Sequence, residues 1–142
     1  MKPASDERTP DGGEYLAARP DREQLLSVRS TDRDDAVVLT VEGDVDGLTA
    51  PRLGTALASA FNRLGGRLLV VDLSRVVFLG SSGLRTLHES ALVAAREHDL
   101  DQLRIVVDHT RPVIRPIEIV GLDQVLALFN TVSDALAAGD LR

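Results

Sequence analysis

The stretch Leu68–Leu84, LLVVDLSRVVFLGSSGL, is the most informative part of this sequence. Its first four residues, Leu68–Val71, are apolar and rich in valine, which is typical of a parallel strand buried on both faces of an α/β sheet. Asp72 is expected to end that strand. A short link then leads to a second apolar run, Val76–Leu79. We therefore expect an α/β fold with Leu68–Val71 at its centre.

The second apolar run is followed by Gly80-Ser81-Ser82-Gly83, and small polar residues of this kind suit a sharp turn into a helix. A serine then sits at a helix start, where its hydroxyl can cap unpaired backbone N–H groups. A negative charge on that serine would meet the positive end of the helix dipole. The turn is therefore a suitable position for a phosphate.

Apolar periodicity predicts alternating strands and helices along the rest of the chain. Strands that alternate with helices imply parallel pairing through right-handed crossovers, and an opening hairpin makes the sheet mixed. The other strands are expected at Leu25–Val28, Val37–Glu42, Leu103–Val107 and Val125–Phe129. Helices are expected from Thr49 to Leu64, from Leu84 to Arg96, around Val113–Val120, and from Thr131 or Ser133 to Ala138.

Two polar segments are interpreted as loops. Asp32–Asp35 is predicted to form the hairpin loop. Gly43–Gly47 is predicted to form a compact acidic loop before the helix that Thr49 caps. The helix after the serine turn is expected to bury Leu84, Leu87, Ala91 and Ala95 on one stripe and to expose Arg85, Glu89 and Arg96 on another.

Length and composition indicate one folded domain. The 142 residues are 44% hydrophobic, with a net charge of -6, which argues against general nucleic-acid binding because that requires a basic surface. There is no cysteine, and no apolar run is long enough to cross a bilayer, so we expect a cytoplasmic protein without a membrane segment. Residues 1–24 lack periodicity and are expected to be a flexible tail before a domain at 25–142.

The serine turn does not match a hydrolase nucleophile. The hydrolase elbow has the pattern G-x-S-x-G, and Leu84 stands where its second glycine belongs. His88, His98 and His109 are available as bases, but no spacing singles one out. A serine hydrolase is therefore only a distant third alternative.

The carboxylates do not indicate a metal or acid/base site either. Asp72, Asp108 and His109 could be metal ligands, but strand-end aspartates usually accept hydrogen bonds from nearby backbone N–H groups. Asp44 and Asp46 fit a solvated turn better than an acid/base pair. We expect no catalysis, no metal and no cofactor.

Residues Asp72–Leu84, DLSRVVFLGSSGL, closely resemble the signature of the STAS domain found in bacterial anti-sigma factor antagonists. The turn Gly43–Asp46 resembles the second marked loop of that family, and the segments Val120–Leu122 and Phe129–Ala135 resemble its closing elements. The resemblance implies a single STAS-type domain, with a mixed sheet of four to five strands backed by helices.

The resemblance also implies a binding protein. Family members bind an anti-sigma factor that is also an ATP-dependent serine kinase, and so release a sigma factor during partner switching, for example in stress responses. The kinase phosphorylates a serine at the start of the second helix, which ends binding, and a serine phosphatase reverses this. Ser81 matches that serine and Ser82 is the second choice, while Gly80 replaces the aspartate usual before the serine.

The partner-binding surface expected from this resemblance joins the acidic loop, the serine turn and the following helix. A scaffold or small-ligand sensor of nucleotides, without a phosphorylation switch, is the alternative function. The oligomeric state is left open. The expected contact residues are Asp44, Asp46, Gly80, Ser81, Ser82, Gly83, Arg85 and Glu89.

Overall fold

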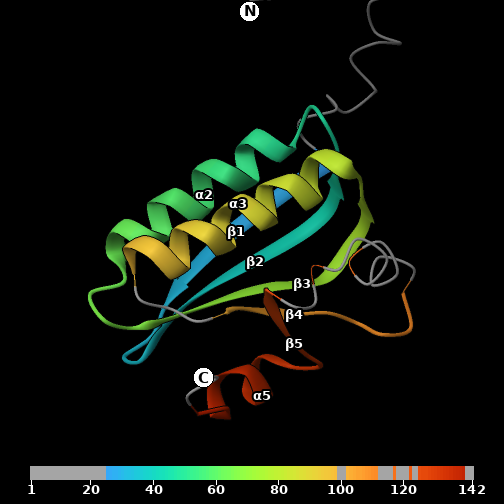
Figure 1. Ribbon diagram of the computed structural model, residues 1–142. Coiled ribbons are helices and arrows are strands. Elements are labelled where there is room, and N and C mark those ends of the chain that lie inside the picture. The colour runs from blue at the N-terminus through green and yellow to red at the C-terminus, as the bar shows by residue number, and fades with distance from the viewer. Residues whose placement is uncertain (1–24, 99–101, 112–116, 118–121, 123–124, 140–142) are drawn as a thin grey trace, which may run out of the picture.

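A computed structural model describes residues 25–98, 102–111, 117, 122 and 125–139. These residues form a five-stranded sheet in the order β1-β2-β3-β4-β5, covered by helices on both faces (Figure 1). The strands are β1 (Leu26–Asp32), β2 (Ala36–Val45), β3 (Leu68–Leu79), β4 (Leu103–Val106) and β5 (Leu126–Phe129). The helices are α2 (Ala50–Arg63), α3 (Ser81–Glu97) and α5 (Val132–Ala137).

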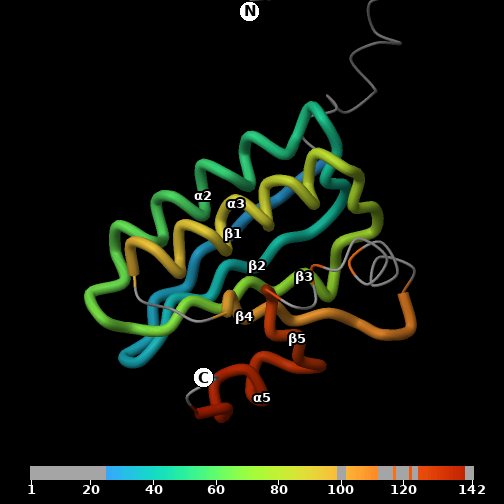
Figure 2. Tube along the Cα trace, viewed as in Figure 1, coloured from blue at the N-terminus to red at the C-terminus, as the bar shows by residue number. Residues whose placement is uncertain are grey.

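The sheet is mixed, as predicted. Strands β1 and β2 pair antiparallel, and β2, β3, β4 and β5 pair parallel in that order. Because the parallel strands are added in one direction, right-handed crossovers bring α2 and α3 to the same face of the sheet. Both helices therefore begin at the same end of the sheet (Figure 2).

The main core lies between the sheet and the pair α2 and α3. On α2, the buried Leu53, Leu57 and Phe61 follow the helical spacing seen in the sequence. On α3, Leu87 and Ala91 are buried as expected. Leu84 is only half-buried and Ala95 is exposed, so the expected stripe was wrong there, and Gly83, Ser90 and Ala94 are buried instead.

A smaller core lies on the other face, beneath α5. Val38, Val70 and Val106 from the sheet pack there with Ala135 of α5. The Thr131 side chain caps α5 by accepting a hydrogen bond from Asp134 N–H at 3.0 Å, which decides between the two expected caps. Buried Arg104 donates to the carbonyl oxygens of Ala135 and Ala138 at 2.6 Å and so fastens the end of α5 to β4.

Strand β3 does not end at Asp72, contrary to expectation, but runs through twelve residues to Leu79. It lies opposite the ten residues of β2, from the pair Ala36↔Leu68 to the pair Val45↔Leu79. Two residues of β3 therefore have no counterpart on β2. The register shifts between Thr40 and Glu42 and between Gly43 and Asp44 of β2. These are β-bulges, which let an interrupted apolar pattern continue as one strand.

The acidic segment was also placed wrongly in part, because residues Gly43–Val45 belong to β2 and only the residues after them form a loop. Gly43 has φ +106°, and a Cβ there would overlap the Leu25 carbonyl oxygen, so glycine is required. Strand β1 reaches Asp32, which makes the hairpin turn shorter than expected, with Arg33 N–H donating to Ala36 O at 2.7 Å.

Several expectations lie outside the described residues. These are the tail at 1–24 and most of the helix expected around Val113–Val120, of which Ile117 is described, helical and buried. Strand β5 begins one residue after the expected Val125, and β4 ends one residue before Val107.

Candidate functional site

Ser81 is the first residue of α3, and its side chain is exposed. Its position at the helix start is as expected, but the N-cap is Gly80, and no side chain caps this helix. Leu84 N–H donates to Gly80 O at 3.0 Å as the first helical bond, so the N–H groups of residues 81–83 precede the helical ladder. The expected serine cap was therefore wrong, while the exposed hydroxyl at the positive helix end is present.

The remainder of the serine turn is part of the helix rather than a loop. Ser82 is half-buried, and its carbonyl oxygen accepts a hydrogen bond from the Thr86 hydroxyl at 3.0 Å. Gly83 is buried, and a Cβ there would lie 2.5 Å from Leu79 Cδ1 and 2.7 Å from Val45 Cγ1. Gly83 therefore brings the start of α3 close to the sheet and holds Ser81 at its end.

The loop between β2 and α2 is organised by Asp46. Its carboxylate accepts hydrogen bonds from the backbone N–H groups of Leu48 and Thr49, both at 3.0 Å. The buried Thr49 hydroxyl donates to Asp44 O at 2.8 Å and accepts from Asp46 N–H at 2.9 Å. Thr49 is the N-cap residue of α2, as expected, but its side chain holds the loop rather than the helix.

The loop lies against the serine turn. A Cβ at Gly47 would lie 3.6 Å from Ser82 Oγ, and Gly80 N–H donates to Val45 O at 2.9 Å. The structure therefore brings together Asp46, Gly80, Ser81 and Ser82, as the sequence suggested. On α3, Arg85 and Glu89 are exposed four residues apart, hence on one helix face beyond Ser81.

The strand-end aspartates behave as expected from turn chemistry. Asp72 accepts a hydrogen bond from Ser74 N–H at 2.9 Å, at the position where β3 bulges. Asp108 accepts from the Thr110 hydroxyl at 2.6 Å and from Thr110 N–H at 2.9 Å. These bonds, with the nearby Arg111 charge, hold the pKa of the Asp108 carboxyl below its usual value.

Two further observations concern the described part of the chain. Within it, no group of three or more His, Asp or Glu side chains is placed to hold a metal ion. None of its helices is both long enough and apolar enough to span a bilayer.

The sequence did not reveal that apolar side chains are exposed next to the serine turn. Leu48 in the loop, and Val77 and Phe78 in β3, are 50%, 63% and 52% exposed. The run Val76–Leu79 resembles a buried strand, and only the bulge in its pairing with β2 distinguishes it. No local pattern could have separated Phe78 from the buried Leu79.

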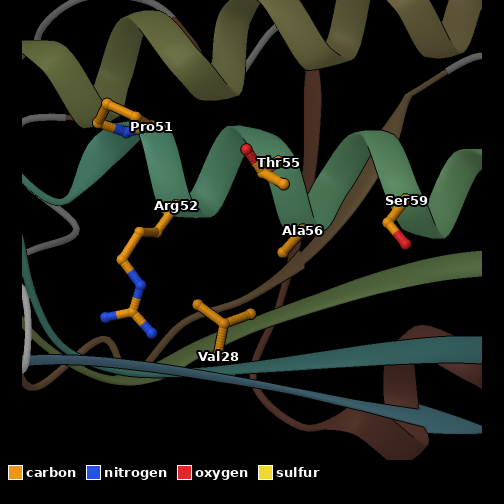
Figure 3. Close-up of a pocket in the computed structure, with 6 residues that line it drawn as sticks. All are labelled: Val28, Pro51, Arg52, Thr55, Ala56 and Ser59. Atoms are coloured by element: carbon orange, nitrogen blue, oxygen red, sulfur yellow. The ribbon is translucent and has the colours of Figure 1, made fainter.

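Two surface grooves lie along α2, and Ser81 lines neither of them. Figure 3 shows the first, where Arg52 extends from α2 toward β1 beside Val28, and Arg52 donates to Leu26 O at 2.6 Å. The second runs between α2 and α3 and includes Thr86 and Glu89. Neither groove is lined by Asp44, Asp46 or Ser81, where a small ligand would bind in the sensor alternative.

Comparison with known proteins gives a consistent result. The model of the STAS domain family matches residues 27–135. The anti-sigma-F factor antagonist RsfB of Mycobacterium tuberculosis is 35% identical over 112 residues, which cover 78% of this chain and 87% of the relative.

Solved structures show the same similarity. An anti-sigma factor antagonist from Mycobacterium paratuberculosis has 33% identity and a TM-score of 0.65, over 78% of this chain and 91% of that chain. The anti-sigma factor antagonist SpoIIAA in its unphosphorylated form has 19% identity and a TM-score of 0.55, over 77% and 92% of the two chains. At that identity the likeness concerns the fold.

Proposed function

This chain belongs to the STAS domain family, and on that premise we propose that it is an anti-sigma factor antagonist. It acts by binding rather than by catalysis: it occupies an anti-sigma factor, and the sigma factor is released for transcription. The relationship to RsfB, 35% identical over most of both chains, supports this function.

We further propose that Ser81 is the phosphorylation site that switches binding off. The observation that carries this proposal is the exposed Ser81 side chain at the first residue of α3. The partner is an anti-sigma factor that has serine kinase activity and binds the ATP. Ser81 Oγ forms a bond to the γ-phosphorus, the bond from that phosphorus to the leaving ADP oxygen breaks, and a base of the kinase takes the hydroxyl proton.

The phosphate acts at the surface and leaves the fold intact. It adds about -1.5 to -2 charges near neutral pH, and the positive end of α3 stabilises that charge. A partner surface built for a neutral hydroxyl would have to bury an unpaired charge, at a cost of several kcal/mol. Hydrolysis by a serine phosphatase restores the binding form.

The experiment is a measurement of intact mass, with site mapping, on protein purified from growing and stressed cells. A species carrying one phosphate on Ser81, whose abundance changes with condition, is the expected result. Protein that is unmodified in every condition would overturn the switch and leave a constitutive binder. Ser81→Ala should abolish the modification, and Ser82→Ala is the matched control that should retain it.

Ser81→Ala is a cleaner variant than the sequence implied. Because Gly80 is the N-cap and no side chain caps α3, the substitution removes no capping bond. We expect its unfolding free energy to stay within about 0.5 kcal/mol of wild type, so a change in phosphorylation reports on the hydroxyl.

The binding surface is proposed to include Arg85 and Glu89, together with the loop at Asp44–Asp46 and the serine turn. Arg85→Glu should weaken binding of the anti-sigma factor, because the charge lies one turn from Ser81. Arg96→Glu, which reverses another exposed charge in the last turn of α3, is the matched control and should bind as wild type does. Equal affinity for the two variants would remove this helix face from the surface.

A further inference from the structure

Three apolar side chains near the serine turn are exposed, and two of them are Leu48 and Phe78. Phe78 precedes the turn on β3, and Leu48 belongs to the loop that passes beside Ser82. We call Leu48 and Phe78 the apolar pair; they are 50% and 52% exposed. Exposed large apolar side chains beside a candidate site commonly mark an interaction surface.

The bulge in β3 explains why Phe78 faces outward. Gly43 pairs with Val76 and Asp44 pairs with Phe78, so Val77 has no partner on β2. The extra residue lets Val76 and Leu79 remain buried while the two residues between them are exposed. The outward position of Phe78 is thus built into the sheet.

The Phe78 ring packs against Gly80, the residue before the proposed phosphorylation site. A Cβ at Gly80 would lie 3.0 Å from Phe78 Cε2 and 3.2 Å from Cζ, so the ring lies against the residue that immediately precedes Ser81. The absence of a side chain at Gly80 leaves room for the ring in this position. The proposed site of the phosphate is therefore the residue directly after the one that the ring packs against.

The charge beside the ring indicates the chemistry of the partner. Asp44 is the cross-strand neighbour of Phe78, and the next pair, Val45 and Leu79, is buried. Because successive side chains of a strand point to opposite faces, Asp44 and Phe78 share the other face. Among the residues that the structure describes, the Asp44 carboxylate has no hydrogen-bond or ion-pair partner. A cationic group on a bound protein would complement it.

We propose that the apolar pair anchors the anti-sigma factor, with Phe78 entering an apolar recess that carries a cationic group facing Asp44. This inference rests on the proposed function and deepens it. Aromatic anchors in desolvated contacts supply much of the binding energy of protein interfaces. Phosphorylation of Ser81 then ends binding because it places charge beside a ring that must lose water on docking.

The test is a calorimetric titration of the full-length protein with each purified anti-sigma factor kinase of the source organism. For the kinase that binds wild type, Phe78→Ala should lower affinity at least about 30-fold and Leu48→Ala about 5-fold. Leu92→Ala is the matched control: Leu92 is 39% exposed on α3, about 16 Å along the helix from Ser81, and its loss should change affinity less than about 2-fold.

A second variant tests the position of the ring without removing it. Gly80→Ser adds a Cβ where the ring edge lies, yet serine is a good N-cap, so α3 should remain folded. We expect affinity to fall about 5-fold while the melting temperature is maintained. Wild-type affinity in both Phe78→Ala and Gly80→Ser would overturn the anchor and leave the proposed function standing. Failure of wild type to bind any of the kinases would overturn both.

Discussion

Strand β3 contains two apolar runs that look alike in sequence and have opposite environments. Leu69, Val70 and Val71 in the first run are no more than 2% exposed, because helices cover both faces of the sheet there. In the second run Val77 and Phe78 face solvent beyond the bulge. The comparison shows that an apolar run predicts a strand, while the layers around it decide whether it serves the core or a surface.

The sharpest test of this difference places a carboxylate in each run. Val70→Asp should lower the free energy of unfolding by about 4 kcal/mol or more, because an unpaired charge would be buried beneath α5. Val77→Asp should change it by no more than about 0.5 kcal/mol. Urea denaturation followed by circular dichroism measures both. Equal losses in the two variants would contradict the comparison.

Helix α5 covers the first apolar run, and Arg104 holds the end of this helix against β4. Arg104→Leu should cost about 2 to 4 kcal/mol, since it removes charged hydrogen bonds to the carbonyl oxygens at the end of α5. Arg111→Leu, which loses only an exposed ion pair with Asp108, should cost less than about 1 kcal/mol. Chemical denaturation of the two variants compares them directly, and a similar cost for both would show that Arg104 does not hold α5.

At the end of the second apolar run, helix α3 begins close to the sheet because Gly83 has no side chain. Gly83→Ala should destabilise by about 1 kcal/mol, because the clash with Leu79 and Val45 exceeds the gain in helix propensity. Gly54→Ala on α2 is the matched control, because its Cβ would lie 3.7 Å from Thr86 Cγ2, an ordinary contact. It should raise stability by about 0.5 to 1 kcal/mol. Thermal unfolding should therefore show shifts of opposite sign.

The smallest effect is expected at the boundary of the second run. Ser81→Asp should leave the protein folded and change its stability by less than about 1 kcal/mol, in the stabilising direction, because the positive end of α3 favours the charge. Circular dichroism and melting temperature check this, with Ser81→Asn as the uncharged control. Unfolding of Ser81→Asp would exclude a switch that acts only at the surface.

Much of the fold was predictable because it depends on local periodicity. The stripe of Leu53, Leu57 and Phe61 indicated α2, and the valine-rich Leu68–Val71 indicated a central strand. The errors lie where pairing overrides local pattern. Asp72 looked like a strand end, yet its hydrogen bond to Ser74 N–H serves a bulge in a continuous strand.

The candidate site was predictable in part for the same reason. Ser81 was found because glycine and serine residues after an apolar run indicate a helix start, and the signature resembled a known family. The N-cap of α3 was assigned to Ser81 although it is the preceding residue, Gly80. An error of one residue is expected, because helix boundaries are the least certain part of a sequence interpretation. Phe78 was missed because an exposed and a buried phenylalanine look identical in sequence.

The sequence by itself determined the alternation of strands and helices, the mixed α/β class and the position of the serine at the start of α3. These properties follow from side-chain spacing and from turn residues, which act within a few positions along the chain. Only the tertiary structure decided that β3 is continuous, that α5 covers one of its apolar runs, and that Phe78 and Leu48 flank the serine turn. Those features depend on strand register and layer packing, which bring together residues far apart in the sequence.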